Sequence, residues 1–405
     1  MNTLVKSALL LALALVVPTL GVVTPAGTTI PGAEAAIRQS GATRLLPQIV
    51  QPGSGVAPAN KAKLAGSVSF RPIRKGRPVT IQRRVGSGSW RKVSTKRQNG
   101  AGVVEFRAAA RNRAGRWYTY RGVARPWNGL RKKAARAQNA ATWNRTFSDE
   151  FTGSLLDPTK WSYRQVGVYS ANNNRACSAS SPDAVKVKDG RVLLYVKADL
   201  ERDLAGPCVE QNKEGETLEN THWYKNGHIS TEHSLNGSFR YGVAAARIKF
   251  DRHVGAHGSF WMQSTVKDIP GEGPAADGAE IDVVEYFGKE LWSGDIFHCL
   301  HYRDAADNYH KVPSSSCRSR RARRALTSSR DDWFKNYHVF SVQWSPKGYT
   351  FRVDGIRTRT ITEGVSKVPE FLVLSMLSSG WEVGMLNRKT LPNATQVDWV
   401  RYWQR

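Results

Sequence analysis

The chain is poor in sulfur, in helical periodicity and in long apolar segments. Its 405 residues include four cysteines and four methionines, and no two cysteines form a CxxC pair, which argues against a zinc ribbon. No apolar 3.6-residue period lasts more than a couple of turns, which disfavours helical and doubly wound folds. Beyond the N-terminal region, no apolar run approaches the roughly 20 residues that a membrane-spanning helix needs.

Acidic residues are almost absent from the first third of the chain. Residues 37–140 hold 24 Lys and Arg against one acid, Glu105, and carry +23 of the formal net charge of +27. Residues 141–405 hold 35 basic and 31 acidic residues and carry only +4. This division predicts a strongly basic module followed by a domain of ordinary charge balance.

The first 35 residues have the pattern of a secretory signal peptide. Lys6 precedes an apolar run over 8–17, Pro18 interrupts it, and residues 33–35 form a small-x-small cleavage site. A membrane anchor is the alternative, but the run is too short to span. We therefore expect a secreted, extracellular protein without a membrane span.

Four cysteines in an oxidising compartment predict two disulfides. Three pairings are possible. The sequential one is favoured, Cys177 with Cys208 and Cys299 with Cys317, because each bond would then close one loop-rich excursion. Each would contribute on the order of 3 kcal/mol to stability.

Within the basic module, residues 36–125, the part from 46 to 125 alternates between apolar and polar side chains in short stretches separated by glycine-containing turns. This pattern predicts a small antiparallel β-sandwich, and it loosely resembles immunoglobulin-like or fibronectin-like modules of secreted bacterial proteins. Residues 126–142 are basic and alanine-rich and are expected to form a linker. The module is expected to bind an anionic polymer or the cell surface, unless its charge only keeps the chain soluble.

Residues 143–405 are strand-like throughout, with alternating stretches at 184–188, 192–196 and 349–353. So many strands in one domain predict an all-β fold built as a large double-sheet sandwich.

The chemically informative stretch contains three acids. Glu280 and Asp282 are two residues apart, so a strand places them on one face. Glu285 lies at an odd offset, and a one-residue bulge at Val283 and Val284 would return it to that face. Three adjacent carboxylates cannot all ionise, which provides a proton donor beside an ionised nucleophile, as retaining glycoside hydrolysis requires. The alternative is an amphipathic strand whose exposed face is acidic.

These residues resemble the ExDxxE signature of glycoside hydrolase family 16, the laminarinase-like endo-β-glucanases, with residues 285–288 as its Glu-Tyr-x-Gly continuation. Other blocks match in the family's order: 147–153, 228–231, 241–243, 246–249, 344–346, 353–355 and 397–403. The resemblance implies a concanavalin A-like β-jelly roll with a sugar cleft across its concave sheet. It also implies that Glu280 is the nucleophile, that Glu285 is the general acid and then the base, and that Asp282 hydrogen-bonds to the nucleophile.

The resemblance further implies binding residues around the acids. Trp261 would stack on a sugar ring, Trp381 is a second candidate platform, and either His301 or His298 would lie near the acid/base. Spacing does not choose between the two histidines. Family members often hold a structural calcium through the aspartate of the closing strand, here Asp398, and no other cofactor is expected.

Two stretches depart from the family pattern. The expected Trp-Pro pair is replaced by His257-Gly258, which predicts a more open wall beside the acids. Residues 317–324 form an unusual basic segment that is expected at the rim of the cleft. Trp292 fits either a core position or a binding position.

Taken together, these features predict a secreted, monomeric, retaining endo-glycosidase acting on a β-1,3-glucan or a mixed-linkage β-glucan. Three alternatives remain open at this point: a glycosyl-transferring enzyme, a non-hydrolytic carbohydrate- or polyanion-binding protein of the same fold, and a hydrolase of an anionic galactan.

Overall fold

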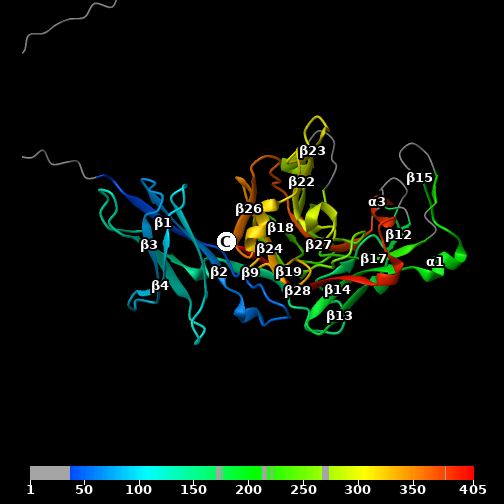
Figure 1. Cartoon of the computed structure of the whole chain (residues 1–405), viewed down its shortest axis with the longest axis horizontal. Coiled ribbons are helices and arrows are strands. Elements are labelled where there is room, and N and C mark those ends of the chain that lie inside the picture. Colours follow the sequence, from blue (N-terminus) through cyan, green and yellow to red (C-terminus); the bar gives the residue numbers. More distant parts are fainter. Residues whose placement is uncertain are drawn as a thin grey trace, which may run out of the picture. The chain divides into compact units, whose positions relative to one another are not determined.

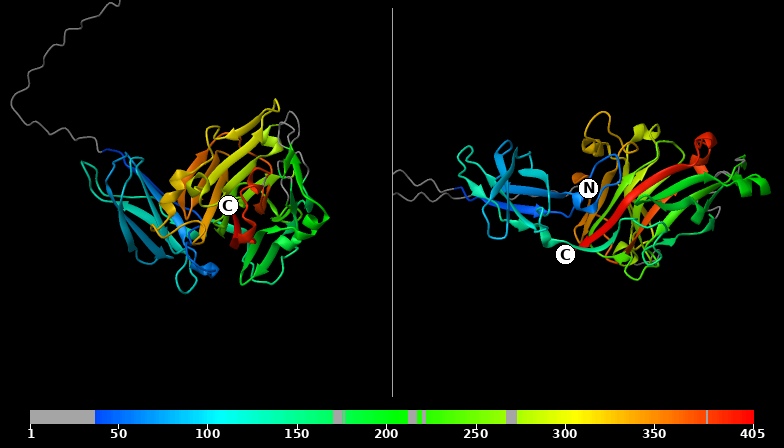
Figure 2. Two further views of the ribbon diagram at one scale, coloured as in Figure 1. Left: turned by 45° about the vertical axis from the view of Figure 1, so that its right-hand side comes forward. Right: turned by 90° about the horizontal axis from the view of Figure 1, so that it is seen from below.

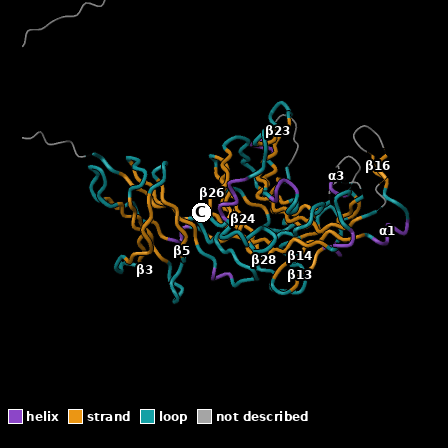
Figure 3. Tube along the Cα trace, viewed as in Figure 1, coloured by secondary structure: helices purple, strands orange, loops and turns teal. Residues whose placement is uncertain are grey.

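The computed structural model shows a protein built almost wholly of strands, with only short helices (Figure 1, Figure 3). The structure describes residues 37–169, 175, 177–211, 217–219, 222–266, 273–378 and 380–405. The predicted signal peptide, residues 1–35, lies outside these ranges. Among the helices in the described ranges, none has the length and apolar character needed to cross a bilayer.

The basic module consists of two antiparallel sheets, coloured blue to cyan in Figure 1. One contains β1 (Ser40–Leu45), β2 (Leu64–Arg71) and β5 (Val103–Ala108). The other contains β4 (Arg91–Arg97), β3 (Pro78–Val85), β6 (Tyr118–Ala124) and β7 (Lys133–Ala134), with β8 (Gln138–Asn139) also paired to β6. The alternating apolar side chains form one core between the sheets, which includes Val68, Phe70, Val79, Ile81, Phe106 and Tyr120. This is the small β-sandwich that the alternation predicts.

Residues 126–142 belong to the module, so the expectation of a linker is wrong. β7 and β8 pair with β6, and the short 3-10 helix η2 (Ala140–Thr142) follows directly. Ala135 and Ala140 are buried in the module's core. Alanine is small and apolar enough to pack there, although its basic neighbours give the segment a solvent-like composition.

Residues 144–404 form the expected β-jelly roll of two layers. The first layer contains β14 (Arg191–Ala198), β28 (Asn393–Gln404), β19 (Gly242–Lys249), β24 (His338–Ser345), β25 (Gly348–Val353) and β26 (Ile356–Ile361), in that order. β28, the long red strand in the right-hand view of Figure 2, also pairs with β9 (Asn144–Asp149), and β14 pairs with β13 (Val185–Lys188). The second layer contains β17 (Tyr224–Ser230), β27 (Glu370–Leu377), β20 (His257–Ser264), β21 (Glu280–Tyr286), β22 (Phe297–Arg303) and β23 (Tyr309–Val312). The layers are joined where β14 pairs with β17.

The remaining elements are short. The strands are β10 (Ser162–Tyr163), β11 (Gly167–Val168), β12 (Ser178–Ser180), β15 (Val209–Gln211), β16 (Thr217–Glu219) and β18 (Ser238–Phe239). The α-helices are α1 (Leu200–Ala205), α2 (Pro274–Asp277) and α3 (Gly380–Val383). The other 3-10 helices are η1 (Ala59–Lys61), η4 (Pro182–Ala184), η5 (Leu291–Gly294), η6 (Arg320–Ala325) and η7 (Arg388–Thr390).

The apolar core between the layers determines which residues of the second layer face outward. Its strands contribute fully buried side chains at alternating positions: Phe260, Met262, Ile281, Leu372, Leu374 and Met376. Burying each such side chain stabilises the fold by about 1.5–3 kcal/mol, which fixes the register of these strands. Side chains of the opposite parity, including Trp261, Glu280 and Asp282, therefore lie on the other face.

Both disulfides are present in the sequential pairing that the sequence favours. Cys177 is bonded to Cys208, 31 residues away, and Cys299 to Cys317, 18 residues away. Because Cys299 belongs to β22, the second bond ties the segment after β23 to the strand beside β21.

Candidate active site

A bulge in β21 places its three acids on one face. Two neighbouring residues of β20 pair with Val284 and Asp282, so Val283 has no cross-strand partner. The register against β22 shifts at the same place, between Asp282 and Glu285. The charges of Glu285 and Glu280 both act on the pKa of Asp282, as a shared face requires. The predicted bulge is therefore confirmed.

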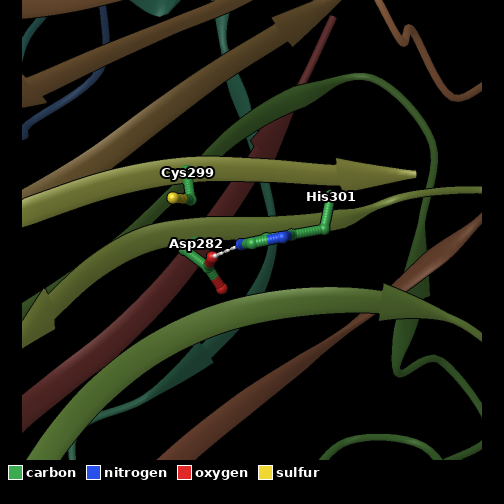
Figure 4. Close-up of side chains that lie close together, drawn as sticks. All are labelled: Asp282, Cys299 and His301. Carbon is green, nitrogen blue, oxygen red and sulfur yellow. Dashed lines mark ion pairs between the residues drawn. The ribbon is translucent and has the colours of Figure 1, made fainter. Parts of the chain in front are cut away.

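Asp282 is the most deeply buried of the three acids and pairs with His301 of β22 (Figure 4). Its Oδ2 lies 3.1 Å from Nε2 of His301. Burial and the negative charge of Glu285 raise the pKa of Asp282 to about 7, against the opposing effect of the hydrogen bond from His301. Asp282 therefore retains a proton nearly up to neutral pH, and the row of acids does not carry its full negative charge there.

His301 is fixed from both sides. Its Nε2 faces Asp282, while its Nδ1 shares a hydrogen bond with the hydroxyl of Tyr309, and the two rings stack with centroids 5.8 Å apart. Burial would lower the pKa of His301, but the hydrogen bond to Asp282 and the charges of the three acids raise it above its ordinary value. His301 is thus a positively charged group beside the acids at mildly acidic pH.

His298 does not reach the acids, so its prediction as a binding residue is wrong. Its Nδ1 donates to the carbonyl of Val283 at 2.7 Å, Thr358 Oγ1 lies 3.0 Å from Nε2, and its ring stacks on Phe351. Burial lowers the pKa of His298 to about 3 and keeps it neutral. The physical reason is the alternation of side chains along a strand. His298 and His301 are an odd number of positions apart on β22, so they point to opposite faces. Of the two candidates, only His301 contacts the row of acids.

Glu285 has a histidine partner that the sequence reveals only as a departure from the family pattern. Nε2 of His257 lies 3.0 Å from Oε1 of Glu285, and its ring stacks on Phe287 with centroids 4.0 Å apart. Burial would raise the pKa of Glu285, but the close contact with His257 and the charges of His257, His301 and Lys311 lower it below its ordinary value. The contact depends on the register of β20 against β21, which sequence spacing does not define.

Trp261 lies on the face of the acids and is beside Asp282 in the β20–β21 register. Its Nε1 donates to Ser375 Oγ at 3.1 Å, and the guanidinium of Arg164 lies 5.1 Å from its ring centroid. The indole is therefore held in one orientation while remaining partly exposed. Such a ring is suited to stacking on a sugar, and that role stays a prediction.

A second group of aromatic rings adjoins His257, the partner of Glu285, through Phe287. Phe287 contacts Trp292, Phe297 and Trp381 with ring centroids 4.8, 5.2 and 5.9 Å away. Trp292 and Trp381 are 40% and 47% exposed. Trp292 is therefore not a core residue, and together with Trp381 it offers exposed apolar surface next to Phe287.

The basic segment 317–324 is attached to the sheet that carries the acids. Cys317 is bonded to Cys299, which lies directly opposite Asp282 on β22. Arg318 and Arg323 form ion pairs with Asp295 at 2.7 and 2.5 Å. The remaining basic side chains are exposed: Arg320, Arg321 and Arg324. The segment thus carries exposed positive charge, and its position at the rim of the cleft stays a prediction.

The residues around Asp398 do not fit the predicted calcium. Its Oδ2 accepts a hydrogen bond from Arg247 Nη1 at 2.5 Å, so a guanidinium already neutralises it. Asp282, Cys299 and His301 also lie close enough together to suggest a metal centre. The sulfur of Cys299 is committed to a disulfide, however, and cannot act as the thiolate that zinc requires.

Comparison with known proteins places this arrangement in context. The model of the family described as glycosyl hydrolases family 16 matches residues 179–401. The glucan endo-1,3-beta-glucosidase A1 of Niallia circulans is 26% identical over 296 residues, which cover 65% of this chain and 38% of that protein. The chain thus spans well under half the length of this relative.

Solved structures that are similar to this chain include the following two. The endo-beta-1,3-glucanase from Pyrococcus furiosus is 20% identical, with a TM-score of 0.47, covering 65% of this chain and 94% of the other. The laminarinase catalytic domain from Thermotoga maritima MSB8 is 18% identical, with a TM-score of 0.46, covering 65% and 98%.

Proposed function

The chain belongs to glycosyl hydrolase family 16, and on that premise we propose that it is an endo-acting glucanase that cleaves internal bonds of a β-1,3-glucan or a mixed-linkage β-glucan with retention of configuration. The observation that carries the proposal is the bulge that turns Glu280, Asp282 and Glu285 to one face of β21. The name of the Niallia circulans relative supports the β-1,3 linkage. The two disulfides support action in an extracellular, oxidising environment.

The proposed reaction is a double displacement. Glu280 attacks the anomeric carbon and forms a glycosyl ester while Glu285 protonates the departing glycosidic oxygen. Glu285 then removes a proton from water, which attacks the ester and releases the sugar with its original configuration. Protonated Asp282 lowers the repulsion within the row, so the nucleophile can remain ionised beside it.

Aromatic rings near the acids would position the glucan. Trp261 lies beside Asp282, and Trp292 and Trp381 contact Phe287, which stacks on His257, the partner of Glu285. Sugar rings stack on such faces through their C–H groups. A second candidate substrate is an anionic galactan, favoured by three exposed arginines of the basic segment: Arg320, Arg321 and Arg324.

The substrate class is tested by incubating the purified protein with laminarin, lichenan, agarose and carrageenan and measuring new reducing ends. We expect release from laminarin or lichenan as short oligosaccharides, with the β-anomer appearing first in proton NMR spectra. Release from carrageenan alone would support the second candidate. Initial release of the α-anomer would contradict retention, and products longer than the substrate would indicate glycosyl transfer.

Replacing His257 by asparagine is expected to shift the alkaline limb of the kcat/KM profile to higher pH. The close contact and the positive charge of His257 help to hold the pKa of Glu285 below its ordinary value. Their loss raises this pKa, and because a general acid must be protonated, activity persists further into the alkaline range. The profile is measured on laminarin with the wild type and the variant in parallel.

The matched control is His233→Asn, which removes an exposed histidine. It should leave both limbs in place. An alkaline limb that stays fixed or moves to lower pH in His257→Asn would show that His257 does not act on the acid/base.

A further inference from the structure

The outer face of one module sheet gathers basic side chains. In β3, Val79 and Ile81 point into the core, so Gln82 and Arg84 point outward. Gln82 pairs with Lys92 of β4 on one side and with Arg121 of β6 on the other. Cross-strand partners share a face, so Arg84, Lys92 and Arg121 lie together on the outside of the sheet.

Trp90 holds two of these cations in fixed orientations. The guanidinium of Arg121 lies 4.1 Å from the centroid of the Trp90 ring, and that of Arg84 lies 4.7 Å from it. Nε of Arg121 also donates to Gln82 Oε1 at 2.9 Å. We call Arg84, Trp90, Lys92 and Arg121 the Trp90 cluster. Its guanidinium groups are ordered before any ligand binds, which reduces the entropy that binding costs.

The Trp90 cluster brings like charges together, and no acid of the described residues forms an ion pair with them. Glu105 is the sole acid of residues 37–140, and it belongs to β5 in the other sheet. Nε of Arg84 is buried and has no hydrogen-bond partner among the described residues. Burial and the nearby charge of Arg84 lower the pKa of Arg121, which indicates uncompensated repulsion. A bound anion would relieve this repulsion and supply the missing acceptor.

We propose that the Trp90 cluster is a binding site for an acidic polysaccharide, a sugar chain that carries sulfate or carboxylate groups. The N–H edges of Arg84 and Arg121 donate hydrogen bonds to these groups, and Lys92 adds a mobile charge beside them. The module would hold the enzyme on an anionic matrix while the acids of β21 act on a neutral glucan.

The geometry favours a polysaccharide over a nucleic acid. Single-stranded nucleic acids are bound largely through base stacking on exposed aromatic rings, and two guanidinium groups lie over the ring of Trp90. Duplex DNA is read by a helix or a two-stranded ribbon that enters a groove, whereas the cluster lies on the face of a sheet. A flexible acidic sugar chain can bind along the exposed face of a sheet and does not need an element that enters a groove.

The proposal is tested with the full chain on immobilised heparin, a sulfated glycan, and polygalacturonate, a carboxylated one. The variant Arg84→Gln/Arg121→Gln is expected to bind the better of the two at least about tenfold more weakly than wild type at 0.1 M salt, since two charge-assisted contacts are lost. Its affinity should also fall less steeply with salt. Trp90→Leu should weaken binding too, because the guanidinium groups lose their support.

The matched control is Arg71→Gln/Arg107→Gln, which removes the same charge from exposed positions on the other sheet. It should bind nearly as tightly as wild type. Equal weakening in both double variants would overturn the proposal, because net charge alone would then explain binding. Tighter binding to duplex DNA than to either glycan, or no binding at low salt, would overturn it as well. Hydrolysis of soluble laminarin should be unchanged in both variants, so a failure here is distinct from a failure of the proposed enzymatic activity.

Discussion

Glu280→Ala is expected to lower kcat on laminarin by about four orders of magnitude or more, because no ester with the sugar can form. Glu280 lies on β21, on the face shared with Asp282 and Glu285, and its backbone is paired with His301 of β22. Loss of its side chain leaves these strands in register, since their inward residues hold the core. The measurement is the rate of reducing-end release at saturating laminarin.

Azide distinguishes a lost nucleophile from a misfolded enzyme. In Glu280→Ala, azide can occupy the space of the missing carboxylate and attack the anomeric carbon from that side, which yields an α-glycosyl azide. Glu363→Ala is the matched control, because Glu363 is exposed and its charge acts on the pKa of Tyr302 rather than on the pKa values of the acids. It should retain full activity. Activity of Glu280→Ala within tenfold of wild type would rule out Glu280 as the nucleophile.

The position of the acids could be predicted because strand geometry constrains it strongly. An even offset between Glu280 and Asp282 places them on one face, and the odd offset of Glu285 requires one extra residue between them. The apolar Val283 and Val284 mark where that residue lies, since both are buried. Local spacing therefore located the bulge, provided that Glu285 shares the face of the other two acids.

The partners of the acids could not be predicted, because they depend on register between strands. His298 and His301 are equally plausible until Cys299 is seen opposite Asp282, which turns His301 toward the acids and His298 away. His257 reaches Glu285 only through the alignment of β20 with β21. In each case the contact depends on the relative shift of two neighbouring strands, and a single sequence does not show that shift.

The composition of 126–142 led to the wrong expectation of a linker. The family resemblance led to the expectation of a calcium at Asp398, which the surrounding residues do not fit. Arg247, which neutralises Asp398, also donates through Nε to the backbone carbonyl of Gln51 at 2.6 Å. That contact joins residues 196 positions apart. A family pattern that assigns calcium to the closing strand contains no information about such a partner.

Asp282 and Glu285 differ in proton affinity because burial and the charge of Glu285 raise the pKa of Asp282, whereas His257 lowers that of Glu285. Asp282 holds its proton nearly up to neutral pH, whereas the pKa of Glu285 is lowered. A bound glucan excludes water from Glu285 and raises its pKa, which favours the protonated form needed for the first step. Once Glu280 is esterified, its negative charge is gone, and Glu285 loses its proton more readily as the second step requires.

Glu285→Ala is therefore expected to slow the hydrolysis of some substrates much more than that of others, depending on their leaving groups. Hydrolysis of laminarin should fall by about 10²- to 10⁴-fold, the usual contribution of general acid–base catalysis, because a sugar alkoxide leaves poorly without a proton. An aryl glycoside with an acidic phenol needs no such proton, so its first step should proceed at nearly the wild-type rate and be seen as a burst of phenol. Azide should then accelerate turnover and give a β-glycosyl azide, the opposite anomer to that from Glu280→Ala.

His233→Asn again serves as a control and should show neither the burst nor the acceleration. An equal loss on both substrate types, or an α-azide product, would mean that Glu285 is not the acid/base.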